Sequence, residues 1–144
     1  MRTVASLVVL LGLMIAASSA HGRGSVPIIE HRDLPVKTGS GAAVSAEQVG
    51  AAIAAALDTA KAEMNFPWKR EPTGPNAVLA TLQVRGKHTI KVEISWSADK
   101  YSALYKDSID MNYKVKKDGP VIHPFYNKWV DELLASINAE LAKL

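Results

Sequence analysis

Most of the side chains that could do chemistry lie in one stretch of the chain, residues 101–129. Within it, Ser108, His123 and either Asp107 or Asp110 supply the residue types of a hydrolase triad. The serine of an α/β-hydrolase sits on a Gly-x-Ser-x-Gly turn, and the chain has no such motif. We therefore favour a non-catalytic role, and we keep a small periplasmic hydrolase that uses Ser108 and His123 as the alternative.

The same stretch predicts a polar and aromatic cluster with either a binding or a structural role. Its members are Asp107, Ser108, Asn112, Tyr113, His123, Tyr126, Asn127 and Trp129. In the structural role, the aromatic residues pack where the last helix meets the third strand, and the short polar residues bond local backbone. His123 then caps the last helix, and Asn127 bonds the loop 107–112. In the binding role, the cluster encloses a polar pocket in which histidine is the residue type that changes charge near neutral pH.

The sequence offers little support for metal, cofactor or nucleic-acid chemistry. The four histidines are scattered, no two of them have helical i, i+4 spacing, and there is no cysteine. No glycine-rich phosphate loop is present, so we expect no metal and no cofactor. The net charge of +3 comes from 17 basic and 14 acidic residues that are mixed along the chain. A dedicated nucleic-acid binder carries a dense basic stripe, so we expect no nucleic-acid partner.

Residues 1–20 have the features of a secretory signal peptide. Arg2 provides the positive charge, residues 4–17 form an uncharged apolar run, and Ser18 and Ala20 are small residues at a cleavage site. The run is too short for a comfortable membrane span, which needs roughly 20 residues. We predict cleavage after Ala20, no transmembrane segment in the mature chain, and a periplasmic or secreted location. An uncleaved N-terminal anchor is the alternative.

The mature chain predicts one domain behind a flexible leader. Residues 21–44 contain two prolines and a Gly-Ser-Gly stretch, which is typical of a tether, with a short extended segment at 26–29. Residues 45–144 are enough for a single domain with a modest core. We expect this domain to be monomeric.

The domain should begin with a helix. Ser45 and Gln48 have the spacing of a capping box, in which each side chain bonds the backbone N–H of the other residue. Apolar residues then recur every three or four positions and define one helix face, formed by Val49, Ile53, Leu57, Ala60 and Met64. Asn65 to Pro67 should end this helix, and residues 68–76 read as a loop because of Pro72, Gly74 and Pro75.

Three strands should follow, because apolar and polar residues alternate in residues 78–85, 90–96 and 101–105. Alternation also reappears at residues 109–113, where the third strand would resume. A three-residue loop at residues 86–88 pairs Val84 with Ile90 and keeps both side chains on the apolar face.

The second turn, at residues 99–100, places Trp96 opposite Ala103 and Ile94 opposite Tyr105. In that register Tyr101, Ala103 and Tyr105 share the face that carries the core.

A final helix completes the predicted fold. Pro124 suits its first turn, where the missing N–H costs nothing. One face is apolar, consisting of Tyr126, Val130, Leu133, Ile137 and Leu141. The expected fold class is thus α+β, a two-layer αβββα arrangement in which a helix, a three-stranded antiparallel meander and a second helix follow in order. Both helices cover one face of the sheet.

Four phrases resemble a family of small proteobacterial exported proteins of unknown function, many described as lipoproteins. The phrases are Ala-Thr-Leu at 80–82, Tyr-Ser-Ala-Leu-Tyr-Lys-Asp-Ser at 101–108, Met-Asn-Tyr at 111–113 and Ile-His-Pro-Phe-Tyr-Asn-Lys-Trp at 122–129. The resemblance spans roughly residues 26–137. It implies a bacterial envelope location and a helix, three strands and a helix, and it implies no catalytic residues. The family often carries a lipid-accepting cysteine, which this chain lacks.

These observations together predict an exported envelope protein that acts as a non-catalytic binding or interaction module. Its partner would be an envelope component or a small ligand.

Overall fold

The centre of the structure is built from the segments in which apolar and polar residues alternate. The computed structural model describes residues 24–144. Strands β5 (Ala77–Val84), β6 (His88–Trp96) and β7 (Lys100–Ile109) form an antiparallel meander. Their inward side chains are buried, including Leu82, Ile90 and Ile94 at 0% exposure. The three predicted strands are therefore confirmed.

Three further strands extend this meander into a six-stranded antiparallel sheet, curved like half a barrel, in the order β2-β7-β6-β5-β4-β3. Strand β4 (Phe66–Gly74) covers most of the segment that reads as a loop, and it pairs with β5 from Trp68 opposite Leu82 onward. Strand β3 (Lys61–Ala62) pairs with the start of β4. The α+β class is confirmed, whereas the simple three-stranded meander is wrong. Beyond Pro67, β4 has no described strand on the side away from β5, and its exposed residues there are mostly polar and include Pro72, as is common at a sheet edge.

The register within the meander differs by two residues from the predicted one. Val84 pairs with His88 and Leu82 with Ile90, so the loop consists of residues 85–87. Arg85 and Gly86 have positive φ angles of 56° and 63°, and the Lys87 N–H bonds the Val84 carbonyl, as in a type I′ turn. A shift of two residues leaves each side chain on the same face, so the predicted buried face is still correct.

The β6–β7 turn shows the same two-residue difference. Trp96 pairs with Tyr101, and Ile94 with Ala103, in place of the predicted partners. Tyr101 and Ala103 are buried and Tyr105 is partly buried, so these three residues share the core face as expected. A β-bulge then shifts the register, and Lys91 pairs with Asp107.

Helix α1 (Ala46–Thr59) begins as the sequence predicts and ends earlier. The Ser45 hydroxyl accepts from the Gln48 N–H at 3.1 Å, and the Gln48 side chain accepts from the Ser45 N–H at 2.9 Å, which confirms the capping box. Ala60 has extended backbone angles, and the chain turns there into β3. Met64 consequently lies outside the helix and is 87% exposed, so its predicted place on the buried helix face is wrong.

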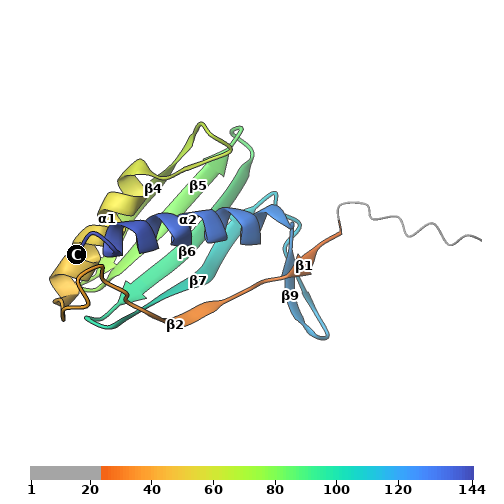
Figure 1. The fold of residues 1–144 in the computed structure, drawn as a ribbon. Coiled ribbons are helices and arrows are strands. Elements are labelled where there is room, and N and C mark those ends of the chain that lie inside the picture. The colour runs from red at the N-terminus through yellow and green to blue at the C-terminus, as the bar shows by residue number, and fades with distance from the viewer. Residues whose placement is uncertain (1–23) are drawn as a thin grey trace, which may run out of the picture.

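Helix α2 (Phe125–Leu141) buries every residue of its predicted apolar face, from Tyr126 to Leu141. Both helices lie on the same face of the large sheet, with α2 crossing it diagonally (Figure 1). Neither described helix combines the length and the apolar character needed to cross a membrane.

Part of the predicted leader is strand. Strand β1 (Val26–Pro27) joins β8 (Lys114–Lys116) and β9 (Gly119–Ile122) in a small second sheet of order β1-β9-β8. Strand β2 (His31–Pro35) pairs with β7 at the edge of the large sheet. Strand β1 lies within the extended segment expected at 26–29, whereas β2 lies where the sequence predicts a tether, because its backbone pairs with a segment far along the chain. The predicted signal peptide, its cleavage site and residues 21–23 lie outside the described residues.

Candidate functional site

The predicted cluster separates into three groups with different surroundings and one residue, Trp129, that belongs to the core. The first is a set of tyrosines around Tyr105. Its hydroxyl is 2.8 Å from Ser108 Oγ, its ring stacks on Tyr113 at 4.8 Å, and Tyr126 meets it edge-on at 5.6 Å. Burial raises the pKa of both Tyr105 and Tyr126, so their hydroxyls stay protonated. Asp107 accepts a hydrogen bond from the neighbouring Ser108 N–H. These contacts are typical of core packing and local turn bonding.

The second group joins α2 to the N-terminal segment. The Asn127 side chain donates to the Pro27 carbonyl at 3.0 Å and accepts from the Ile29 N–H at 3.1 Å. The expected bond from Asn127 to the loop 107–112 is therefore wrong. The sequence could not reveal this partner, because about a hundred residues separate the two bonded positions.

Trp129 belongs with the helix–sheet core. Its ring is 1% exposed, and its Nε1–H donates to the Glu63 carboxylate at 3.0 Å. That hydrogen bond lowers the pKa of Glu63, and the Lys128 ammonium at 3.4 Å lowers it further, while burial opposes both effects. Trp129 is thus a core aromatic residue, which is the structural role that its spacing predicts.

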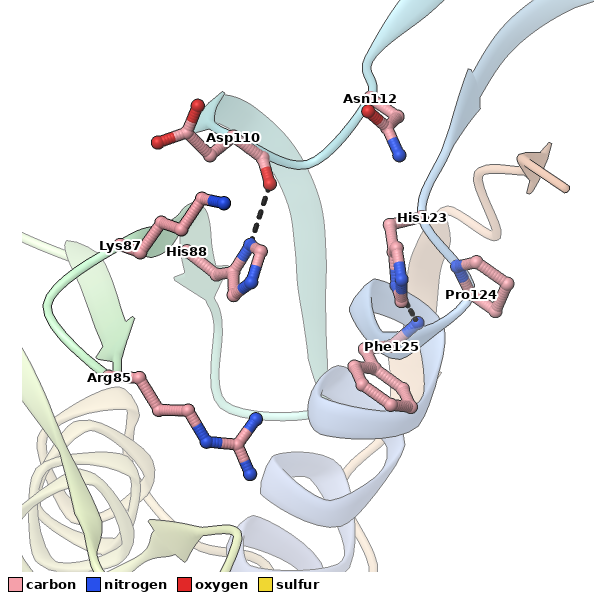
Figure 2. Close-up of a pocket in the computed structure, with 8 residues that line it drawn as sticks. All are labelled: Arg85, Lys87, His88, Asp110, Asn112, His123, Pro124 and Phe125. Carbon is pink, nitrogen blue, oxygen red and sulfur yellow. Dashed lines mark hydrogen bonds between the residues drawn. The ribbon is translucent and has the colours of Figure 1, made fainter. Parts of the chain in front are cut away.

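The third group lines an open cavity of about 690 Å³ at the start of α2. Three segments form its walls: the β5–β6 turn, the chain after β7, and the chain that leads into α2 (Figure 2). The lining residues are Arg85, Lys87, His88, Asp110, Asn112, His123, Pro124 and Phe125. Of the predicted cluster, Asn112 and His123 reach this cavity.

The chain after β7 owes its shape to one buried anchor. Met111 is 2% exposed, and its carbonyl accepts from the His123 N–H at 2.7 Å. On either side of it, Asp110 and Asn112 have positive φ angles of 55° and 54°, which aspartate and asparagine tolerate better than most residues. This backbone conformation places both residues at the cavity wall.

The two imidazole rings of the cavity have different hydrogen-bonding states. His88 Nδ1 lies 2.7 Å from the Asp110 carbonyl, and a carbonyl can only accept, so Nδ1 carries the proton. His123 Nδ1 accepts from the Phe125 N–H at 3.1 Å, so in the neutral ring the proton is on Nε2. The ring centroids are 6.4 Å apart. Neutral His88 therefore has its lone pair at Nε2, and neutral His123 has its proton there.

His123 also caps α2 through the bond to Phe125, which is the structural role that its position predicts. The hydrolase alternative gains no support from this geometry. Ser108 does not line the cavity, and its hydroxyl is hydrogen-bonded to Tyr105. In the neutral ring of His123, Nδ1 accepts from the Phe125 N–H and Nε2 carries the proton, so neither nitrogen is placed to act as a general base.

Charge around the cavity is unevenly placed. Arg85 extends from the β5–β6 turn in the direction of α2, the Lys87 side chain runs toward Asp110, and the Asp110 carboxylate points away from the two rings (Figure 2). Within residues 24–144, no group of three or more His, Asp or Glu side chains is arranged to hold a metal ion. The cavity wall is thus made of cationic, amide and imidazole groups, with Pro124 and Phe125 as its apolar part.

Sequence reasoning missed the half of this site that belongs to the β5–β6 turn. The sequence does not reveal the register between β6 and β7 at this end of the sheet, and that register places the turn beside the chain after β7. Once Thr89 is known to pair with Ile109, the next residues outward, His88 and Asp110, must be neighbours.

Comparison with protein-family models, with curated proteins and with solved structures finds no match to the chain, so the site is interpreted from its own geometry.

Proposed function

We propose that this chain is an exported, non-catalytic binding protein that takes a small polar ligand into the cavity between His88 and His123. The proposal is carried by an open cavity whose wall brings together ionic, amide and imidazole side chains, and in which a backbone carbonyl holds His88 in place. His88 can accept a hydrogen bond at Nε2, and the Arg85, Lys87 and Asn112 side chains on the wall can donate, so the cavity suits a polar group.

Cavity size and composition also favour a ligand. The volume of about 690 Å³ lies within the range of small-molecule sites, roughly 300–1,000 Å³. Among the described residues that line the cavity there is no serine, threonine or cysteine, so none of them is a common hydroxyl or thiol nucleophile. Binding therefore explains the arrangement better than covalent catalysis. The envelope location is supported by the signal-like composition of residues 1–20.

Side-chain NMR of the histidines tests this proposal directly. We would titrate the ¹⁵N-labelled protein with a library of small polar compounds and follow the imidazole signals. Compounds that bind should shift His88 and His123 and leave His31 unchanged, since His31 lies in β2 and does not line the cavity. His88→Gln should abolish the response, and His31→Gln should preserve it.

Two outcomes would contradict the proposal. In the first, no compound shifts the His88 and His123 signals. In the second, a bound compound is hydrolysed by the wild-type protein and not by Ser108→Ala, which would establish the hydrolase alternative.

A further inference from the structure

A second pocket lies at the opposite end of β5, between α1 and the β4–β5 turn, and it shares no lining residue with the cavity of the proposed function. Its volume is about 210 Å³. We infer that this pocket binds one small uncharged aromatic ring, such as that of a phenol. The residues that decide the ligand class are Gly50, Ala54, Arg70, Pro72, Pro75 and Trp96.

Trp96 forms a wall that is fixed before a ligand arrives. Its indole Nε1–H donates to the Ala46 carbonyl at 3.0 Å, and its backbone N–H donates to the Asn76 carbonyl at 3.0 Å. The first bond ties the ring to the start of α1, and the second ties the strand to the β4–β5 turn. A ligand therefore meets an indole that is already in position, and binding does not require this side chain to become ordered.

Gly50 allows α1 to approach this indole closely. A Cβ at position 50 would lie 2.8 Å from the Trp96 ring, which is closer than real Cβ contacts come. One turn later, Ala54 also lines the pocket with only a methyl group. The helix wall of the pocket is thus made of short side chains. This wall leaves space beside the indole in place of filling it.

The volume and the walls fit a single flat ring. An apolar cavity of about 150 Å³ can hold benzene, whereas sites for larger ligands occupy roughly 300–1,000 Å³. The pocket of about 210 Å³ therefore has room for one ring with a small substituent. The rings of Pro72 and Pro75 and the indole of Trp96 line it. An aromatic ring gains more from contact with an indole than its buried area alone provides, so it should bind better than an aliphatic ring of similar size.

The charge at the pocket favours an uncharged ligand. Arg70 Nε donates to Asp58 Oδ1 at 2.7 Å, and Arg70 Nη2 donates to Asp58 Oδ2 at 3.1 Å. This hydrogen bonding lowers the pKa of Asp58, so both groups are charged at neutral pH and offset each other. A ligand carboxylate would gain little from a guanidinium that already holds a carboxylate. The same bonds hold the guanidinium beside the pocket, where it can attract the face of a ring.

NMR of the tryptophan indole N–H groups tests the inference with three probes: phenol, cyclohexanol and benzoate. Phenol should shift the Trp96 signal and leave Trp68 and Trp129 unchanged, because neither of these lines the pocket. Cyclohexanol should bind roughly threefold or more weakly than phenol, since it lacks the aromatic contact. Benzoate should also bind more weakly. Asp58→Asn leaves the Arg70 charge without its partner, so it should narrow the difference between benzoate and phenol.

Two leucine variants on the same helix locate the binding site. Ala54→Leu fills the pocket and should weaken phenol binding at least about tenfold, because the added side chain occupies the space of the ring. Ala51→Leu is the matched control, because Ala51 is an exposed residue of α1 that does not line the pocket. It should leave the affinity unchanged. Equal unfolding midpoints of the two variants would show that filling the pocket, and not a loss of folding, removes binding.

Three results would overturn the inference. In the first, phenol does not shift the Trp96 signal of the wild-type protein. In the second, cyclohexanol or benzoate binds as tightly as phenol, so the pocket does not select an uncharged aromatic ring. In the third, the two leucine variants weaken phenol binding equally. None of these results bears on the cavity of the proposed function, which the signals of His88 and His123 report separately.

Discussion

At the scale of single residues, Glu63 shows how a position with no sequence signal gains a role. It lies just after β3 with a φ angle of 48°, and it accepts hydrogen bonds from the Trp129 indole and the Lys128 ammonium. The carboxylate thereby satisfies the one polar atom of a buried tryptophan ring. The burial of Trp129 was predictable from the spacing on its helix, whereas the partner of its N–H was not.

Acid titration of stability tests this contact. The Trp129 hydrogen bond, aided by Lys128, lowers the pKa of Glu63 below its ordinary value of 4.5, so folding favours the ionised carboxylate. The resulting stability is present above the pKa of the unfolded chain and is lost as the pH falls through the lower pKa of the folded state. Glu63→Gln should therefore be less stable than the wild type at neutral pH, and the difference should shrink as the pH falls well below 4.5.

Urea unfolding at a series of pH values measures this difference. Glu71→Gln, at an exposed position of β4, is the matched control and should track the wild type more closely. If Glu63→Gln were less stable than the wild type by the same amount at every pH, the charge of the carboxylate would play no part in this contact.

At the scale of secondary-structure elements, the N-terminal segment is the main departure from expectation. Residues 24–35 bond to β7, β9 and α2, and they contribute Ile28 and Leu34 to the margin of the core. Asn127 holds this segment at two backbone groups, one on either side of Ile28. Between β1 and β2, the Ile28 N–H still bonds the Pro120 carbonyl of β9, and the Asn127 side chain supplies partners for the Pro27 carbonyl and the Ile29 N–H.

Hydrogen exchange of the Ile29 amide should report whether Asn127 holds the N-terminal segment in place. Asn127→Ala removes the acceptor of that amide and the donor to Pro27, and each hydrogen bond contributes about 0.5–1.5 kcal/mol. We expect exchange at Ile29 to rise about tenfold, with a small loss of global stability. Asn138→Ala removes another amide from α2, one that bonds Tyr101, and should leave Ile29 unchanged. Equal exchange at Ile29 in both variants would show that Asn127 does not protect this amide.

At the scale of the whole molecule, the two helices and the N-terminal segment, residues 24–35, enclose one core against the large sheet. Strands β2 and β3 occupy the two edges of that sheet, so β7 and β5 are both interior strands. Removing β2 would expose the backbone of β7, and an uncovered edge strand promotes aggregation. The N-terminal segment is therefore part of the folded unit.

Truncation tests this conclusion. A chain that begins at residue 36 should unfold with at least about 2 kcal/mol less free energy than one that begins at residue 24. It loses the pairing of β2 with β7 and the packing of Ile28 and Leu34. It should also aggregate at lower concentration. Equal unfolding free energies for the two chains, measured in urea, would instead support the prediction of a flexible leader.

The sequence by itself determined the features that depend on neighbours a few residues away. The capping box of Ser45, the apolar face of α2 and the inward faces of β5, β6 and β7 all follow from local spacing. A register error of two residues at both turns left those faces correct, because side chains alternate with a period of two.

Only the tertiary structure decided which distant segments pair. Strand β4 carries mostly polar residues, and β2 lies in a segment rich in turn formers, so backbone hydrogen bonds to β5 and β7 create both strands. The cavity has the same origin, because His88, Asn112 and His123 come from three segments that meet only when the sheet is paired and α2 is docked. Apart from proline, every residue carries the same backbone N–H and C=O groups, so their pairing leaves no side-chain pattern. The site that depends on this pairing appears only in the folded chain.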